Sequence, residues 1–465
     1  MRKNFTASIA LLIFGCTSPA ASQVFQELYS FEPFGTNGDG PYGGLIQARD
    51  HNYYGTTFYG GAWDCGTLYK MTTNGVLTII ASFNGTTTDQ HPITQLVEAN
   101  DGSFYGATVY PSRIFEATPD GTLTSAGGGI GTIMSPILQA RDGCLYVVDM
   151  GDPAAYAGTD SIYDGSISRF NEGGGPGGGV YQFARASHPE NGYYPSGGLV
   201  QAPDGNFYGV TSEGGAYGYG VAYRLTTNGN YAVLCSFSRG PALNDAVYPY
   251  GRLLLASDGN LYGVAGAYYE DGYLFRLTTN GVLTTLVRFG TWDAQGQLVW
   301  GQTPNAGLIE ANDGNFYGTT MYGGDPRFWP TGLGTVFRVT PAGVVTTIVS
   351  FTETGGPYPG ATPHAGLLQA SDGNLYGTTA NAGSRGAGNI FRIIMPGPLL
   401  SVAAAGAGQV VLSWRTNYQG YGLQSSPDLQ PPNWSPCTNA PVVVGHHYYV
   451  TNSLTGPARF FRLQK

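Results

Sequence analysis

The residues that could catalyse a reaction are few and scattered in this chain of 465 residues. No histidine lies in an HExxH or HxH pattern, which would hold a zinc ion, and no serine or cysteine recurs in the glycine-flanked turn that presents a nucleophile. The sequence therefore offers no catalytic residue and favours a protein without enzymatic activity, although distant residues can meet in a fold. The histidines are His51, His91, His188, His364, His446 and His447.

Neither the acidic turns nor the glycine-rich turns match a known ion or phosphate site. A calcium loop needs several oxygen donors and a distal glutamate, and even the nearest segment, Thr36–Gly40, lacks that glutamate. The run Gly173–Gly179 has no Lys-Ser/Thr after it, so a hairpin is favoured over a phosphate loop. We expect no metal ion and no cofactor.

Aromatic side chains are the best candidates for binding a ligand. Aromatic residues make up 13% of the chain, and many lie in glycine-rich segments of variable length. Their flat faces suit sugar rings or a protein partner, whereas the alternative is that they fold inward and fill loops that have no other core. The candidate ligand-binding residues are Tyr59, Trp63, Tyr217, Tyr219, Tyr268, Tyr269, Trp292, Trp300, Tyr322 and Trp329.

An internal repeat positions these segments. The pattern Gly-Leu-Ile/Val/Leu-Gln-Ala-x-Asp-Gly-Asn-x-Tyr-Gly occurs in seven degenerate copies, 41 to 62 residues apart, which is the length of a four-stranded propeller blade with its loops. The tyrosine of each Tyr-Gly pair is expected to pack inside a blade. The anchoring aspartates are Asp50, Asp101, Asp142, Asp204, Asp258, Asp313 and Asp372.

Copy six shows the expected strands most clearly. Alternating apolar residues predict strands at 306–311, 315–321, 334–340 and 344–351, joined by tight glycine-containing turns and one longer loop. The first and third turns should lie on one face of the repeat array. The long aromatic loops between second and third strands should lie on the other, together with the connections between blades.

The last copy lacks a fourth strand, and the N-terminal segment supplies one. Copy seven stops after 389–394, whereas Phe25–Phe31 resembles the fourth strands of other copies. This predicts a seven-bladed β-propeller closed by an N-terminal strand, because closure removes exposed sheet edges. The fold class is all-β.

The repeat residues resemble the bacterial GloVer tandem-repeat proteins. The likeness covers about residues 23–397 and is clearest in Gly366–Thr379, whereas copies two and three depart from the pattern, for example at Cys144 and Val147. The resemblance implies export and a propeller-like repeat, and it assigns no chemistry. Copies two and three are expected to be the least regular.

Beyond Pro398 the repeat is lost. Val410–Trp414, Tyr421–Ser426 and Arg459–Leu463 predict strands of a separate small sheet structure. The pattern resembles a fibronectin III-like appendage, so we expect a small C-terminal β-sandwich at 398–465. The propeller is assigned to 23–397 and a signal peptide to 1–22.

The N-terminal segment indicates export. Arg2 and Lys3 precede a short apolar stretch, 7–15, and small residues at 18–22 suit signal peptidase. Lipidation at Cys16 is a less favoured alternative, because Phe14 breaks the lipobox pattern. No segment is long enough to span a bilayer as an apolar helix. We expect a secreted or cell-surface location.

The sequence leaves the disulfide state of the remaining cysteines open, and these are Cys65, Cys144, Cys235 and Cys437.

The net charge of the chain limits the classes of partner that it is expected to bind. A formal net charge of −9 argues against nucleic acid. The leading hypothesis is an exported, monomeric binding or adhesion protein without enzymatic activity, whose ligand is a polysaccharide or surface protein at the long-loop face. Two alternatives stay open: a polysaccharide hydrolase or lyase with an active site at the propeller axis, and a purely structural envelope protein.

Overall fold

The computed structural model describes residues 23–464 except 86–89, 111, 129–130, 152–163, 174, 240–245, 267–271, 291–300, 325–326, 328–331, 407, 417–419, 429, 446 and 454–458. The predicted signal peptide and Cys16 thus lie outside the described residues. The chain divides into two compact units, one with Phe25–Glu310 and Gly314–Ile394 and the other with Met395–Lys465. The described residues are almost entirely β-structure, with a short 3-10 helix at Pro189–Asn191.

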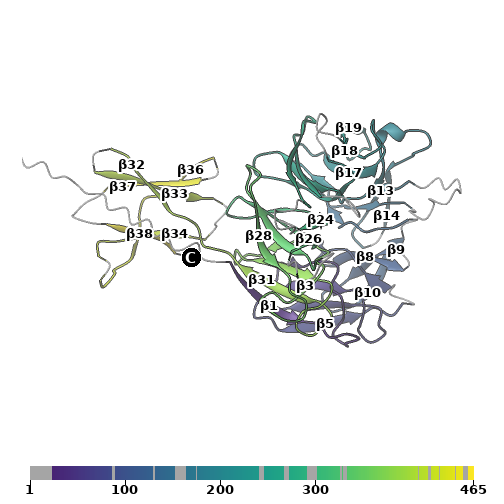
Figure 1. Cartoon of the computed structure of the whole chain (residues 1–465), viewed down its shortest axis with the longest axis horizontal. Helices are drawn as coiled ribbons and strands as arrows, with labels where there is room; N and C mark the ends of the chain where they lie inside the picture. The colour runs from purple at the N-terminus through teal and green to yellow at the C-terminus, as the bar shows by residue number, and fades with distance from the viewer. Residues whose placement is uncertain are drawn as a thin grey trace, which may run out of the picture. The chain divides into compact units, whose positions relative to one another are not determined.

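The larger unit contains seven antiparallel sheets of four or five strands among its described residues, and each sheet corresponds to one repeat copy (Figure 1). The first three copies comprise β2 (Ile46–Gln47), β3 (Tyr53–Thr57), β4 (Thr67–Met71) and β5 (Leu77–Ser82); β6 (Gln90–Pro92), β7 (Val97–Glu98), β8 (Phe104–Tyr110), β9 (Ser112–Ala117) and β10 (Leu123–Gly128); and β11 (Leu138–Gln139), β12 (Leu145–Asp149), β13 (Ser166–Phe170) and β14 (Pro176–Gln182). The next two comprise β15 (Tyr193–Pro195), β16 (Val200–Gln201), β17 (Phe207–Glu213), β18 (Val221–Leu225) and β19 (Tyr231–Ser236); and β20 (Pro249–Leu255), β21 (Leu261–Ala265), β22 (Tyr273–Leu277) and β23 (Leu283–Arg288). The last two comprise β24 (Gln302–Pro304), β25 (Ile309–Glu310), β26 (Phe316–Tyr322), β27 (Thr335–Val339) and β28 (Val345–Ser350); and β29 (Leu368–Gln369), β30 (Leu375–Thr379) and β31 (Asn389–Ile394), joined by β1 (Val24–Ser30).

The predicted strands of copy six are confirmed except for the first. That strand was expected at 306–311, but only Ile309–Glu310 pairs with β26. The preceding segment leaves the ladder because it packs on the neighbouring copy: a Cβ on Gly307 would lie 3.0 Å from the carbonyl oxygen of Arg252. In six of the seven copies the strand at this position is two residues long, and β20 in copy five is the longer exception.

The N-terminal strand completes the last sheet, as predicted. The sheet order is β1-β31-β30-β29, and Figure 1 shows β1 beside β31. Phe25 stacks on Phe391 with ring centroids 5.4 Å apart. The Asn389 side chain donates a hydrogen bond to Glu27, 362 residues away along the chain. The two ends of the repeat array are therefore joined by backbone pairing and side-chain packing.

The hydrophobic core lies between neighbouring sheets. Each of six described clusters in this unit combines buried residues of two neighbouring copies, and one of them joins copy seven to copy one through Tyr376, Ile390 and Tyr69. A sheet of this size is stabilised mainly by what its faces bury. Each copy therefore depends on its neighbours on both sides.

The glutamine of the repeat pattern also links neighbouring copies. In copy one, Gln47 accepts a hydrogen bond from the backbone N–H of Ser371 in copy seven, at 2.7 Å. Gln201 of copy four accepts the corresponding bond from Arg141 of copy three, at 2.9 Å. Where the pattern has glutamate, as at Glu98 and Glu310, the carboxylate accepts the bond instead. A side-chain oxygen at this position thus satisfies a backbone donor of the preceding copy.

The repeated aspartate and tyrosine form one structural unit. In six copies the tyrosine hydroxyl donates to the aspartate four residues earlier, at 2.8 to 3.2 Å. In all six of these copies the other carboxylate oxygen accepts the N–H two residues after the aspartate, which closes the turn. The tyrosines are buried, so the prediction that they pack inside the sheets is confirmed. The turns are held by these bonds.

These carboxylates predict a loss of stability in acid. Burial raises the pKa of Asp204 and Asp258, but hydrogen bonds from Asn206, Asn260 and the tyrosines outweigh it and hold each pKa below the ordinary 3.8. A depressed folded-state pKa contributes stability that is complete above the ordinary value and is lost as the pH falls below it. We expect the melting temperature to fall steeply below about pH 4. Melting curves of Asp204→Asn should show a shallower fall, and an equal fall would contradict this assignment.

A glycine faces an aromatic ring at the centre of six sheets. Gly263 pairs with Phe275 across β21 and β22, and a Cβ on Gly263 would lie 2.4 Å from that ring. The ring therefore lies over the glycine backbone. Copy three has Val147 in place of the glycine, and its partner is the small Ser168. The departure of copy three from the repeat pattern is thus a paired exchange that keeps the space filled. The other pairs are Gly55–Tyr69, Gly106–Phe115, Gly209–Tyr223, Gly318–Phe337 and Gly377–Phe391.

The smaller unit contains two sheets. One has the order β32-β33-β37-β36 and the other β35-β34-β38. Their shared core includes Trp414 and Val450 of the first sheet and Leu423 of the second. The strands are β32 (Ser401–Ala404), β33 (Gln409–Arg415), β34 (Gly422–Ser426), β35 (Ser435–Pro436), β36 (Val442–Val444), β37 (His447–Ser453) and β38 (Phe460–Gln464).

Two general features concern the described residues alone. Across the described ranges, no helix is long and apolar enough to cross a membrane. The four cysteines that the structure describes are half-buried and not joined by disulfides.

Candidate functional site: a cavity lined by all seven repeats

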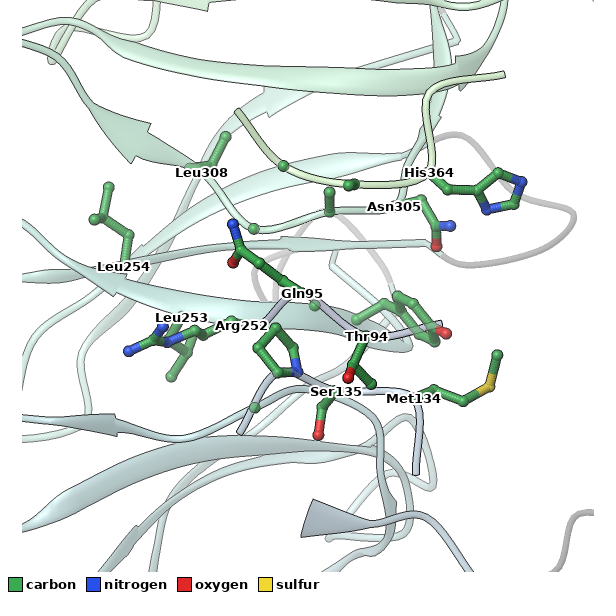
Figure 2. Close-up of a pocket in the computed structure, with 18 of the residues that line it drawn as sticks. Thr94, Gln95, Met134, Ser135, Arg252, Leu253, Leu254, Asn305, Leu308 and His364 are labelled. Carbon is green, nitrogen blue, oxygen red and sulfur yellow. The ribbon is translucent and has the colours of Figure 1, made fainter. Parts of the chain in front are cut away.

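A cavity of about 380 Å³ lies where the seven copies converge (Figure 2). Every copy contributes residues from the segment around the start of its repeat pattern, which in copy five belongs to β20. We call the residue immediately before the first leucine of the repeat pattern, or before Ile137 in copy three, the ring position. Six of the seven ring residues line the cavity, and in copy one the neighbouring Gly43 does. The ring residues are Gly44, Gln95, Pro136, Gly198, Arg252, Gly307 and Gly366.

Glycine at the ring position lets neighbouring copies approach closely. A Cβ on Gly366 would lie 3.0 Å from the carbonyl oxygen of Gly307, and one on Gly44 would lie 2.9 Å from Cβ of Ala365. A Cβ on Gly198 would lie 3.1 Å from the carbonyl oxygen of Pro136. Much of the cavity wall is therefore backbone, and the few ring residues that carry long side chains set its chemistry.

A second set of residues lies two positions before the ring position in each copy. We call these seven residues the outer ring, and all of them line the cavity. Figure 2 shows His364, Asn305 and Met134 at one end of the cavity and Arg252 and Leu254 toward the other. The outer ring is mostly polar or aromatic. Its members are Tyr42, Ile93, Met134, Ser196, Tyr250, Asn305 and His364.

Aromatic rings run from the outer ring to the surface. We call Tyr42, Phe58, Tyr59, His91 and His364 the aromatic track. The ring centroids of Tyr42 and His364 are 4.7 Å apart, and those of Tyr42 and Phe58 are 5.1 Å apart. Phe58 stacks on His91 and meets the edge of Tyr59, each at 4.7 Å. Tyr59 is 42% exposed, so the track joins the cavity to solvent.

Burial changes the titration of the cavity groups. It lowers the pKa of His364 to about 4, so this imidazole is neutral at physiological pH. Burial also raises the pKa of Tyr42, and the nearby Tyr59 and Asp39 add to that effect. Among the described lining residues there is no aspartate or glutamate, and Arg252 is the charged one. No group of three or more potential metal ligands occurs in the part of the chain that the structure describes.

The sequence matches a known repeat family. The model of the Gloeobacter/Verrucomicrobia repeat matches residues 111–298 and 296–409, which together make up more than half of the chain. The chain belongs to this family. The resemblance noted from the repeat residues is thus confirmed for the Gloeobacter/Verrucomicrobia repeat. No curated protein matches the chain.

Solved structures support a propeller scaffold for this repeat-family protein. Virginiamycin B lyase from Staphylococcus aureus is 14% identical and aligns over 80% of this chain and 99% of its own, with a TM-score of 0.52. A catalytically inactive variant of that lyase with quinupristin is 13% identical over the same shares, with a TM-score of 0.50. A gluconolactonase from Xanthomonas campestris is 12% identical over 64% and 89%, with a TM-score of 0.37. At these identities the likeness to the two lyase structures concerns the fold alone, and the lower TM-score of the gluconolactonase supports no statement about this chain.

The predicted ligand residues of this repeat-family protein are dispersed. Trp63 and Tyr217 are more than half exposed, and Tyr59 belongs to the aromatic track. Tyr219 packs against Tyr248, with ring centroids 5.4 Å apart, and Tyr322 is half-buried at the end of β26. Within the described residues, no ring contact joins one of these five to another. Their binding role stays a prediction. The remaining candidates, Tyr268, Tyr269, Trp292, Trp300 and Trp329, lie outside the described residues.

Sequence reasoning missed the cavity of the repeat-family protein and its ring residues. The signal was present, because aligning the seven copies gives glycine in four of them and arginine in copy five at one position. What the repeat pattern does not reveal is that this position faces the shared cavity. The sequence does not mark Tyr42 and His364 as site residues, because they precede the repeat pattern in a segment where the copies differ.

Proposed function

We propose that this protein is an exported carbohydrate-binding protein without enzymatic activity, whose ligand lies in the cavity and on the aromatic track. In this proposal the seven sheets are the blades of a β-propeller closed by β1. The C-terminal unit is a fibronectin III-like sandwich, and the leader at 1–22 directs export. The observation that carries the proposal is the continuous path of rings from exposed Tyr59 to His364 in the cavity.

The chemistry of the path suits sugars. Aromatic faces pack against the apolar faces of sugar rings, and hydroxyl and amide side chains bond to sugar hydroxyls. Asn305 supplies an amide group in the cavity, whereas the buried hydroxyls of Ser196 and Thr94 already bond to the carbonyl oxygen of Pro249 and the N–H of Ala107. A glycoside hydrolase would use a pair of carboxyl groups, and the described lining residues include none. These features favour binding over hydrolysis.

A lyase is the second candidate, favoured by one contact. The rings of Tyr42 and His364 lie 4.7 Å apart in the cavity, and the neutral imidazole is able to accept a proton. A tyrosine with a nearby base is one arrangement by which a polysaccharide can be cleaved through elimination. This candidate predicts an unsaturated product, which absorbs ultraviolet light.

Replacing Tyr59 with alanine is expected to weaken polysaccharide binding by about threefold to tenfold, because it removes the exposed end of the aromatic track. Binding would be measured with a glycan array and then by titration of the strongest polysaccharide. Tyr217→Ala is the comparison variant, since it removes a similarly exposed tyrosine that belongs to the candidate set predicted from the sequence but lies outside the aromatic track. Its affinity should be unchanged.

The outcomes separate the alternatives. Equal losses in both variants, or no loss in either, would contradict the aromatic track as the site. Polysaccharide binding by neither wild type nor variants would favour a protein partner or a structural role. Ultraviolet-absorbing product in the wild-type sample, lost in His364→Ala, would replace the binding proposal with the lyase.

A further inference from the structure

Arg252 departs from the repeat at the ring position. Four copies have glycine there, and in three of them a Cβ would lie 3.0 or 3.1 Å from a backbone carbonyl oxygen of the neighbouring copy. Copy five instead has an arginine whose side chain lines the cavity, and Figure 2 shows it toward the end away from His364. Closing the ring does not require this side chain. Its presence in a single copy indicates a role other than packing.

The guanidinium group has no partner in the described protein. The Arg252 side chain is half-buried, and part of it remains open to the cavity. No hydrogen bond or ion pair with a described residue satisfies it, and no described lining residue carries a negative charge. Removing a charge from water is costly unless a partner compensates, and arginine in particular presents a fork of N–H donors that fits a carboxylate. An anionic ligand group would supply the missing acceptor.

The surroundings narrow the class of anion. Arg252 is the one charged side chain among the described lining residues, so the site matches a single negative charge better than a doubly charged phosphate. Gln95, at the ring position of copy two, already donates to the carbonyl oxygen of Leu45 at 2.8 Å and leaves its own amide oxygen as an acceptor. The amide group of Asn305 lines the same space, whereas the buried hydroxyls of Thr94 and Ser135 already bond to the N–H of Ala107 and the carbonyl oxygen of Val148. Such a wall suits a molecule that carries one carboxylate and several hydroxyls.

We propose that the cavity binds the carboxylate of an acidic sugar, such as a hexuronic acid residue of a polysaccharide, through Arg252. The inference rests on the proposed carbohydrate-binding function and names its ligand class. The carboxylate accepts hydrogen bonds from the N–H groups of Arg252. The sugar hydroxyls meet the polar wall, and the rest of the polysaccharide leaves along the aromatic track.

The test uses the full-length protein and two substitutions that the repeat itself provides. Arg252→Gly restores the residue of four other copies, and Arg252→Gln introduces the residue of copy two. Oligogalacturonate, its reduced uncharged counterpart and inorganic phosphate would be titrated calorimetrically into each protein. Wild type should bind oligogalacturonate at least about tenfold more tightly than the reduced oligosaccharide, and both variants should lose that preference. Melting temperatures of the variants within a few degrees of wild type would show that the fold is intact.

Each contrary result has a distinct meaning. Equal binding of charged and reduced oligosaccharide, unaffected by Arg252→Gly, would overturn the carboxylate assignment and leave carbohydrate binding in place. Equally tight binding of phosphate would overturn the sugar-acid class in favour of a simple anion site. Binding of a neutral polysaccharide alone on the array would also overturn the inference, whereas no binding of any glycan would overturn the proposed function itself.

Discussion

Replacing Gly263 with valine is expected to lower the free energy of unfolding by about 2 to 3 kcal/mol. The new Cβ would lie 2.4 Å from the ring of Phe275 and 2.7 Å from Leu253, and both side chains are buried. Overpacking of this kind forces side chains off their rotamers. Gly179→Val is the matched control, because a Cβ there meets no atom within 4 Å. Urea denaturation of both variants measures the difference.

The exchange seen in copy three supplies a stricter test. Val147 opposite Ser168 suggests that valine is tolerated once its partner is small. The double variant Gly263→Val/Phe275→Ser should therefore be more stable than the sum of its single changes predicts, with a coupling of about 1 kcal/mol or more. Phe275→Ser alone should be strongly destabilising, since it empties a fully buried site. Strict additivity would show that the two positions do not share space.

Deleting residues 23–31 is expected to abolish cooperative unfolding and cause aggregation. The deletion removes β1, exposes the unpaired edge of β31 and takes Phe31 from the cluster that joins copies seven and one. Exposed strand edges pair readily with other chains. Differential scanning calorimetry and size-exclusion chromatography would measure both effects, with deletion of residues 1–22 alone as the control.

A peptide of residues 23–31, added in trans, should restore part of the melting transition, because strand addition needs mainly backbone hydrogen bonds. A milder variant, Phe31→Ala, should fold but lose about 3 to 5 kcal/mol, since Phe31 is fully buried against Tyr69. A deletion variant that melts like the wild type would show that β1 is dispensable for closure.

The sheets could be predicted because each copy repeats the same local signals. Alternating residues, the aspartate turn and the position of Phe25–Phe31 correctly indicated four-stranded units and the strand exchange between the chain ends. The length of the first strand could not be predicted, because contacts such as that of Gly307 with Arg252 arise between copies. Local periodicity contains no information about such contacts.

The candidate site was harder to predict than the fold. Exposed aromatic residues such as Trp63 and Tyr217 are visible in the sequence, but the structure does not bring them together. Arg252 and Gln95 reach the cavity because copies two and five face a common centre. That convergence depends on how the copies are arranged in space, and a single repeat does not specify it.

The pairing of β1 with β31 also affects how the chain folds during synthesis. Glu27 and its partner Asn389 are 362 residues apart, so at ordinary translation rates β1 emerges roughly 20 to 70 s before β31 exists. During that interval its backbone donors and acceptors have no native partner. The earlier copies can form their mutual cores, yet the final sheet must wait for the end of the repeat array. Assembly of the complete array is therefore a late event, and its timing depends on the rate of translation.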